Sequence, residues 1–305
     1  MSTALTVDQL QARFGRPGRV RFEAGPGGLV RALVTAREAE AHLSLQGAHV
    51  THYQPQDQAP ILFLSTRSAF APGKAIRGGV PVVFPWFGAR AGDPSAPAHG
   101  FARAAAWQME SVDEAPDGTV AVTLSLTASE ATRAVWAPAF VARYRVAVGA
   151  TLDLRLEIEN ASAGPFAFEE ALHTYLGVAD VRMASISGLA GTSYIDKVDR
   201  MARKAEGTAP IRLTAETDRI YLGTRATCVV DDPKGGRRLV VEKAGSDATV
   251  VWNPWAEKAR ALSDLGGDQW PAFVCIETAN AADHAVTLAP GARHAMRAVI
   301  RAEPR

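Results

Sequence analysis

Five polar side chains lie within apolar, strand-like segments of the chain and are of the types that proton transfer and anion binding require. They are Arg77 in IRGGVPVVFPWFG, His99 and Arg103 in HGFAR, His173 in EEALHTYLG, and Glu277 in FVCIETAN. Imidazole and carboxylate groups are the usual proton donors and acceptors of enzymes, and guanidinium groups bind phosphate or carboxylate through paired hydrogen bonds. The combination favours proton transfer on a small anionic ligand.

Arg77 precedes a segment that cannot form a regular central strand. Gly78 and Gly79 permit a sharp turn or a close approach of the backbone to a ligand, and Pro81 and Pro85 lack the N–H group that a ladder needs. At such an irregular edge Arg77 can contact a phosphate or carboxylate through two hydrogen bonds. A structural ion pair is an equally consistent interpretation of this arginine.

His99 and Arg103 flank a Gly-Phe pair after a loop, residues 88–98, that is rich in Gly, Pro, Ala and Ser. Loops of unusual conformation carry function more often than regular strands do. A single loop histidine is commonly only a hydrogen-bonding surface residue. Its occurrence together with Arg103 favours a functional role.

His173 and Glu277 both lie in apolar surroundings. Such surroundings keep an imidazole neutral near pH 7, and a nearby carboxylate, such as Glu169 or Glu170, would move it back toward protonation. A core histidine with satisfied hydrogen bonds would have the same pattern. Glu277 follows the apolar run 272–276, and a carboxylate at the end of a buried strand is costly unless it is paired or functional. Burial would raise its pKa toward the range of a general base, so the pattern favours a catalytic role.

Other candidates each have two interpretations. Asp218 in ETDRIY can orient a ligand hydroxyl or pair with Arg219. Three tryptophans can form an apolar wall of the kind on which sugars stack, or they can fill the core: Trp252, Trp255 and Trp270. The chain has no Walker motif, GxGxxG, GxSxG or HExxH. No motif therefore indicates nucleotide binding, dinucleotide binding, a serine hydrolase or a zinc protease.

Composition excludes further classes. The chain has 305 residues, of which 47% are hydrophobic and 21% charged, so a large core is possible and disorder is not indicated. The net charge of +1 gives no electrostatic basis for nucleic-acid binding. Cys228 and Cys275 lie in apolar runs and are expected to be buried small hydrophobic residues, with a disulfide between them as the alternative. No Cys/His spacing indicates zinc, and we expect neither a metal nor a cofactor.

The dominant period of the sequence is two. Residues 151–160, TLDLRLEIEN, place apolar side chains on one face and charged ones on the other, which is typical of a half-buried antiparallel strand. Short helical turns are expected at 129–137 and 255–265. Similar alternation occurs at 20–24, 42–46, 119–127, 142–148, 237–243, 248–252 and 295–302. We predict an all-β fold, a large antiparallel sandwich or barrel with a few short helices, and a single domain over residues 1–305.

The N-terminal segment 1–16 is predicted to contain a short helix. Thr6 and Gln9 have the spacing of a capping box, and Gly15 can end the helix. The segment lacks the long apolar region of a secretory signal, and no stretch reaches membrane-spanning length. We therefore expect a cytoplasmic protein, a monomer or weak dimer, that binds a small molecule rather than nucleic acid or a membrane.

Six ordered motifs resemble the glucose-6-phosphate 1-epimerase (hexose-6-phosphate mutarotase) branch of the aldose 1-epimerase superfamily. The motifs are IRGGVPVVFPWFG, HGFARAAAW, EEALHTYLGV, ETDRIY, VVWNPWAEKARALSDLG and CIETAN, and the match extends from about residue 20 to about residue 300. Several motifs in order are more specific than any one of them. The resemblance implies a galactose-mutarotase-like β-sandwich with the site in a groove on the concave face of one sheet.

The resemblance also implies an activity and its catalytic residues. His173, in the HTY motif, would protonate the ring oxygen of the sugar, and Glu277, in the ETAN motif, would take the proton of the anomeric hydroxyl. The protein would then interconvert the α and β anomers of a hexose 6-phosphate, glucose 6-phosphate first, without a metal or cofactor. The alternatives are an aldose 1-epimerase acting on unphosphorylated sugars and a non-catalytic sugar-binding protein on the same fold.

The same resemblance assigns the substrate contacts. Arg77 and Arg103 would hold the phosphate or nearby hydroxyls, His99 would contact the sugar, and Asp218 would bind a sugar hydroxyl. One departure concerns the HG pair, because many relatives have Gln immediately before it and this chain has Ala98. One polar ligand contact of the family is therefore expected to be missing.

Overall fold

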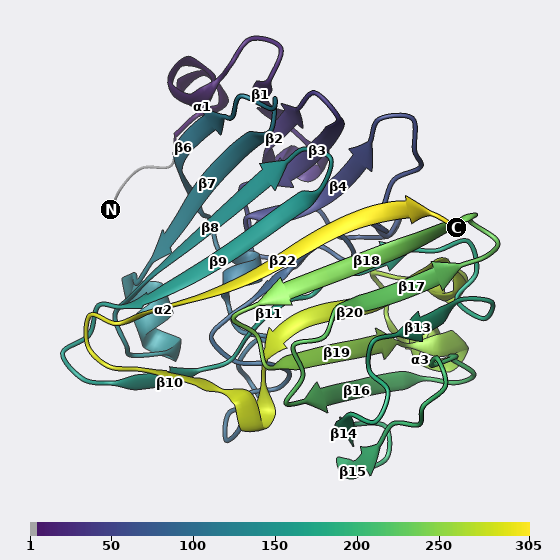
Figure 1. Ribbon diagram of the computed structural model, residues 1–305. Helices are drawn as coiled ribbons and strands as arrows, with labels where there is room; N and C mark the ends of the chain where they lie inside the picture. The colour runs from purple at the N-terminus through teal and green to yellow at the C-terminus, as the bar shows by residue number, and fades with distance from the viewer. Residues whose placement is uncertain (1–4) are drawn as a thin grey trace.

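The computed structural model describes residues 5–305 as a strand-rich molecule with a few short helices (Figure 1). The predicted N-terminal helix is present as α1 (Val7–Phe14), with the capping box between Thr6 and Gln9 formed and Gly15 at its C-cap. The part of the predicted segment on residues 1–4 lies outside the described residues. Leu10 and Phe14 bury the apolar side of this helix.

One large antiparallel sheet contains most of the long strands that alternation predicted. In β9 (Leu152–Asn160) the apolar side chains point into the core and the charged ones outward, as the period of two requires. Its eight strands, in spatial order, are β13 (Ser185–Ser187), β17 (Cys228–Asp232), β18 (Arg237–Ala244), β22 (Arg293–Pro304), β9 (Leu152–Asn160), β8 (Phe140–Val148), β7 (Val120–Thr127) and β6 (Gln108–Glu114).

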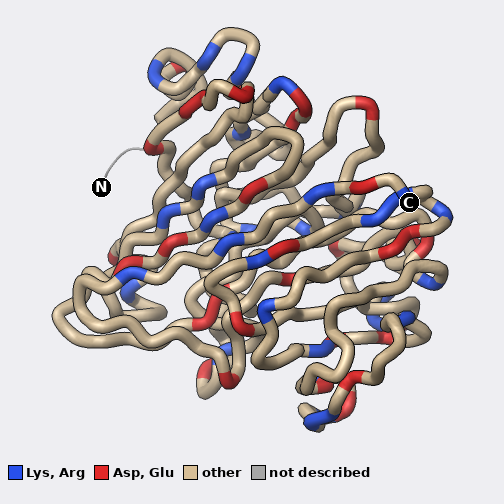
Figure 2. The backbone as a smooth tube through the Cα atoms, in the orientation of Figure 1, with Lys and Arg blue, Asp and Glu red and all other residues tan. Residues whose placement is uncertain are grey.

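The outer face of this sheet is a mixed-charge surface. Figure 2 shows basic and acidic residues interspersed along β8, β9 and β22. Cross-strand ion pairs form there, for example between Arg297 and Asp153 at 2.8 Å and between Arg143 and Glu159 at 3.2 Å. Such exposed pairs contribute little stability, so this face is a solvated surface.

A second eight-stranded sheet carries the candidate site. It includes β12 (Tyr175–Gly177), which pairs with β20 (Phe273–Asn280) beyond the end of β11 (Glu170–Leu172). Its strands are β15 (Ala202–Ala205), β14 (Ser193–Asp196), β16 (Thr217–Leu222), β19 (Ala248–Asn253), β20 (Phe273–Asn280), β11 (Glu170–Leu172), β5 (Val82–Val83) and β12 (Tyr175–Gly177). Only two residues of the Gly- and Pro-rich segment form a strand, in agreement with its predicted irregularity.

Two smaller sheets and short helices complete the fold. A four-stranded sheet near the N-terminus contains β1 (Val20–Ala24), β2 (Val30–Thr35), β3 (Ala39–Ser44) and β4 (His49–Pro55), and β10 (Phe166–Phe168) pairs with β21 (Val286–Leu288). The strand predicted at 42–46 is wrong in its bounds, because β3 ends at Ser44 and a turn follows. The helical turns are α2 (Glu130–Val135) and α3 (Trp255–Ala261), and the 3₁₀ turns are η1 (Pro26–Gly28), η2 (Ala102–Ala104), η3 (Trp270–Ala272) and η4 (Ala282–His284).

The site-bearing sheet is apolar on both faces. Val251, Val274 and Ile276 belong to the main core, whereas Val250 and Cys275 belong to a second buried cluster on the opposite face. Cys275 and Cys228 are buried free thiols, so their interpretation as small hydrophobic residues is confirmed. Within residues 5–305, no helix has the length and apolar character needed to cross a membrane.

Candidate active site

The pairing of three strands places His173 beside Glu277. β11 and β12 both pair with β20 in a single register, so the two residues between them lie opposite β20, and His173 faces Glu277 across the ladder. The amide of His173 donates to the carbonyl of Pro81 at 3.0 Å, and its Nε2 lies 3.3 Å from Oε1 of Glu277. Glu277 lies inside β20, which continues to Asn280, so its predicted position at the strand end is wrong.

Burial determines the ionisation of this pair. The side chains of His173 and Glu277 are 8% and 1% exposed. Burial raises the pKa of Glu277 well above its ordinary value, and the nearby Asp218 charge adds to this. Burial lowers the pKa of His173, as do His99 and the site arginines. Burial therefore favours the state in which neither group is charged, with Glu277 protonated and His173 neutral. The pair then shares one titratable proton.

Both members of the pair retain an unused polar atom. Nδ1 of His173 and Oε2 of Glu277 are buried and have no hydrogen-bond partner in the structure. A buried polar group without a partner costs about 1–3 kcal/mol, so a ligand that supplies hydrogen bonds to these two atoms would be favoured. The site is thus arranged to exchange hydrogen bonds with something that the protein itself does not supply.

Aromatic side chains fix the orientation of the histidine. Its ring stacks on Tyr175, with centroids 4.8 Å apart and planes 11° apart, and it meets the edge of Trp252 at 5.8 Å. Trp252 therefore borders the His173–Glu277 pair, which fits the interpretation of an apolar wall. Trp255 and Trp270 instead pack on each other at 4.3 Å and against the core.

His99 also reaches the pair. Its backbone has a φ of 63°, and its Nδ1 accepts from the amide of Gly88 at 3.3 Å, which places the ring proton on Nε2. The ring lies edge-on to His173, with centroids 5.6 Å apart. Burial lowers the pKa of His99, with a further contribution from Arg103, so it serves as a neutral hydrogen-bond donor.

The two glycines after Arg77 allow the backbone of this segment to pass close to its neighbours. Gly78 and Gly79 have φ of 103° and 62°, and a Cβ on them would come within 2.5 Å of the Phe63 carbonyl oxygen and 2.2 Å of the Val50 carbonyl oxygen. This tight passage sets the position of the preceding arginine.

Arg77 itself is in an ion pair and is also directed at the site. Its Nε donates to Asp264 at 3.1 Å, its Nη1 donates to the hydroxyl of Tyr175 at 3.0 Å, and Nη2 lies 3.0 Å from the same carboxylate. The structural ion pair that the sequence left open is therefore present. A guanidinium has five N–H groups, so two remain for a ligand.

Arg103 makes fewer hydrogen bonds and ion pairs with the protein than Arg77 does. Its Nη2 donates to the carbonyl of Ala98 at 2.7 Å, and among residues 5–305 it has no carboxylate within ion-pair distance. Burial lowers the pKa of Arg103, and the charge of Arg77 does so as well. The two guanidinium charges lie near each other, and Asp264 pairs with Arg77 alone, so the charge of Arg103 is left without a paired carboxylate among the described residues.

Asp218 pairs with a residue that sequence analysis missed. Lys197 Nζ lies 3.0 Å from Asp218 Oδ2, whereas Arg219 pairs with Glu206, so the predicted alternative of an Asp218–Arg219 pair is wrong. Lys197 also lies over the ring of Phe87 at 5.2 Å. The structure thus brings all six predicted residues together at one site and adds polar side chains at Lys197, Asp264 and Tyr175.

Comparison with known proteins assigns the family. The sequence profile of the Aldose 1-epimerase family matches residues 32–301, and the chain belongs to this family. A protein of Escherichia coli (strain K12) that is provisionally named a glucose-6-phosphate 1-epimerase is 38% identical over 246 residues, covering 81% of each chain. A protein of Cenchrus ciliaris with the same provisional name is 33% identical over 288 residues, covering 92% of this chain and 86% of its own.

Solved structures agree with this assignment. A Salmonella typhimurium protein provisionally described as a mutarotase aligns with a TM-score of 0.88 and 31% identity over 95% of each chain. A galactose mutarotase-like protein of Clostridium acetobutylicum aligns with a TM-score of 0.73 at 13% identity, a likeness of fold alone, over 94% of this chain and 98% of its own. The predicted galactose-mutarotase-like β-sandwich is confirmed.

Proposed function

We propose that this protein interconverts the α and β anomers of a hexose 6-phosphate, with glucose 6-phosphate as the first substrate to test. The observation that carries the proposal is the buried His173–Glu277 pair, whose members lie 3.3 Å apart and each keep one unpartnered polar atom. The two oxygens that must gain and lose protons are bonded to the same sugar carbon, C1. An acid and a base that act on them must therefore lie next to each other.

In this mechanism Glu277 is the base and His173 the acid. The carboxylate takes the proton of the C1 hydroxyl while the imidazolium gives its proton to the ring oxygen. The bond between C1 and the ring oxygen breaks as the C1 carbonyl forms. Rotation about the C1–C2 bond presents the other face, and closure returns the proton of the ring oxygen to His173 and that of Glu277 to O1. Each general acid–base contribution is worth roughly 10²–10⁴-fold in rate.

The remaining residues position the substrate in this proposal. Arg103, supported by Arg77, holds the phosphate, because its guanidinium has free N–H groups and no carboxylate partner among the described residues. His99 donates from Nε2 to a sugar oxygen, and Asp218, held by Lys197, accepts from a sugar hydroxyl. Ala98 offers only its carbonyl, which Arg103 already uses.

The relatives support the phosphorylated substrate by name, since the Escherichia coli and Cenchrus ciliaris proteins are both provisionally named glucose-6-phosphate 1-epimerases. Anomer exchange followed by NMR, on glucose 6-phosphate and on free glucose side by side, tests the proposal. Fast exchange of the phosphorylated sugar and slow exchange of glucose would support it. Equal rates would identify a general aldose mutarotase, and a binding signal without exchange would identify a sugar-binding protein.

A further inference from the structure

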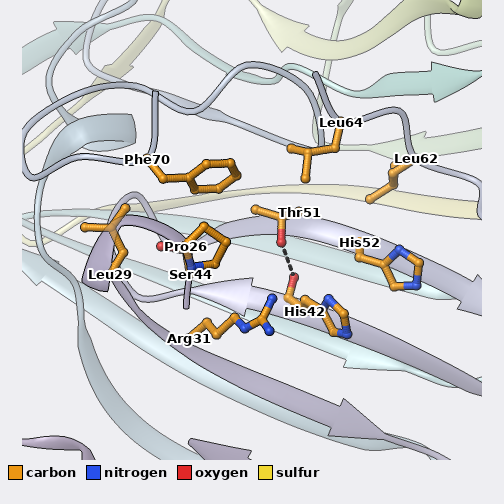
Figure 3. Close-up of a pocket in the computed structure, with 10 residues that line it drawn as sticks. All are labelled: Pro26, Leu29, Arg31, His42, Ser44, Thr51, His52, Leu62, Leu64 and Phe70. Atoms are coloured by element: carbon orange, nitrogen blue, oxygen red, sulfur yellow. Dashed lines mark hydrogen bonds between the residues drawn. The ribbon is translucent and has the colours of Figure 1, made fainter. Parts of the chain in front are cut away.

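A second cavity lies between the outer face of the N-terminal sheet and the segment that follows β4 (Figure 3). Its volume is about 150 Å³. A cavity of about this volume elsewhere holds one benzene-sized molecule, so there is room for a ligand of about six non-hydrogen atoms. None of the residues proposed for catalysis or substrate binding lines it.

A β-bulge builds the polar side of this cavity. His42 on β3 pairs with His52 on β4, but the next residue, Leu43, pairs with Val50, so Thr51 is an extra residue on β4. Bulges redirect side chains and occur frequently beside functional sites. Here the bulge brings Thr51 and His52 to the same cavity as His42, whose ring centroid lies 4.7 Å from that of His52.

The cavity contains polar groups that lack partners. Ser44 is 5% exposed, and its hydroxyl is buried with no hydrogen-bond partner. Arg31 donates from Nε and Nη2 to Glu23, at 2.9 and 2.6 Å, which leaves its Nη1 unused by the protein. Both groups can donate. The Ser44 hydroxyl is the buried one, and an unsatisfied buried donor is costly, whereas the Arg31 side chain is 28% exposed. Within residues 5–305 there is no group of three His, Cys, Asp or Glu residues that could hold a metal ion.

The opposite side of the cavity is apolar. Figure 3 shows Leu62, Leu64 and Phe70 facing the polar groups across the opening. The intervening Phe63 points the other way, where it stacks on Phe273 at 4.7 Å beneath the catalytic groove. Residues 62–64 therefore lie between the cavity and the proposed active site, and they contribute side chains to both.

We propose that this cavity binds a small organic monoanion, a carboxylate on a short apolar body. The carboxylate accepts hydrogen bonds from the Ser44 hydroxyl, the His42 ring and Nη1 of Arg31, and the apolar body lies against Leu62, Leu64 and Phe70. A single negative charge fits because Glu23 already neutralises part of the local positive charge.

Binding at this site is linked to proton uptake. Burial and the charges of His52 and Arg31 together lower the pKa of His42 to about 4, against the opposite effects of Glu40 and Glu23. A bound carboxylate adds a negative charge beside the ring and raises that pKa. The affinity should therefore increase as the pH falls from neutral toward 5, with a fraction of a proton taken up per ligand.

Butyrate is the probe, and butyramide is its uncharged control. Titration calorimetry on the full chain, in two buffers of different ionisation enthalpy, gives both the affinity and the proton uptake. We expect butyrate to bind in the millimolar range and butyramide to bind at least about tenfold more weakly, because charge-assisted hydrogen bonds are the stronger ones. His42→Gln should remove the proton uptake, and Leu64→Trp should block binding by filling the cavity while keeping every polar group.

Arg103→Ala distinguishes this cavity from the catalytic groove. Because Arg103 does not line the cavity, this variant should bind butyrate as the unchanged chain does. Loss of binding in Arg103→Ala, or full binding in Leu64→Trp, would place the butyrate in the groove and overturn the proposal. Equal affinity for butyrate and butyramide, or no binding of either, would overturn it as well. Thermal unfolding of each variant shows that it is folded, and no outcome depends on the catalytic proposal.

Discussion

Replacing Arg103 by alanine gives the sharpest test of the phosphate site. In the structure this side chain makes one protein hydrogen bond, 2.7 Å to the Ala98 carbonyl, and no ion pair with any described residue. Its removal should therefore cost only about 1 kcal/mol of folding free energy. With a bound phosphate it can form two charge-assisted hydrogen bonds of about 1.5–3 kcal/mol each. We expect KM for glucose 6-phosphate to rise by about 10²–10⁴-fold, and KM for free glucose to change little.

The same change at Arg77 should behave differently. Arg77→Ala leaves the carboxylate of Asp264 and the hydroxyl of Tyr175 without their partner. Each such loss costs about 1–3 kcal/mol when the remaining group is buried. We therefore expect a clear fall in unfolding temperature for Arg77→Ala and a smaller one for Arg103→Ala.

Steady-state anomer exchange by NMR, on both sugars and at several concentrations, separates KM from kcat. Arg297→Ala is the matched control, because it removes one positive charge from the outer face of the other sheet, where Arg297 pairs with Asp153. It should leave both substrates unaffected. If Arg103→Ala damages glucose and glucose 6-phosphate equally, Arg103 contacts sugar hydroxyls or supports the structure, and the reasoning from its free N–H groups is wrong.

Three further predictions concern the pair and the buried histidines. Glu277→Gln and His173→Asn should each lower kcat by about 10²–10⁴-fold with the fold intact, and the double variant should lose little more, because the two groups act as a unit; near-normal exchange in either would remove it from the mechanism. The rate of anomer exchange should follow a bell-shaped pH profile. It should fall on the acid side as the His173–Glu277 pair takes up a second proton, and on the alkaline side as the pair loses the proton that it shares. A pH-independent rate measured by NMR would contradict the shared proton. Finally, burial lowers the pKa of His49 from 6.5 to about 4. As the pH falls, His49 therefore takes up its proton in the unfolded chain before it does so in the folded chain. This should lower the free energy of unfolding by about 3 kcal/mol between pH 6.5, above which the contribution is fully present, and pH 4. Urea unfolding at several pH values should show this loss, and His49→Gln should lack it.

Strand alternation could be predicted from the sequence because it is a local property. The charged and apolar side chains of residues 151–160 alternate strictly, and β9 occupies Leu152–Asn160. The capping box at Thr6 was equally readable, since both partners lie within one turn. The position of Glu277 could not be read in the same way. The run of apolar residues ends before it, but β20 continues because its neighbours β11 and β19 supply hydrogen bonds to either side.

The hydrogen-bond and ion-pair partners of the site residues could be identified only from the folded structure. Asp264 follows Arg77 by 187 residues, and neither segment carries a local signal that the two would meet. Lys197 reaches Asp218 because β14 and β16 are neighbours, whereas the sequence suggested the adjacent Arg219. The β-bulge at Thr51 could not be predicted from the sequence either, because a register shift depends on the pairing between strands and not on the pattern within one strand.

The proposed phosphate site and the His173–Glu277 pair are coupled by electrostatics. Burial lowers the pKa of His173, and the charges of His99, Arg103 and Arg77 lower it further. The mechanism needs the opposite, a proton on His173 and a charge on Glu277. A phosphate bound to the arginines would neutralise their effect and raise the pKa of His173, so the substrate itself would favour the reactive distribution of the shared proton. A free sugar would lack this contribution even if its ring occupied the groove correctly. The arginines would then increase the rate as well as the affinity for the phosphorylated substrate, which is why kcat and KM must be measured separately.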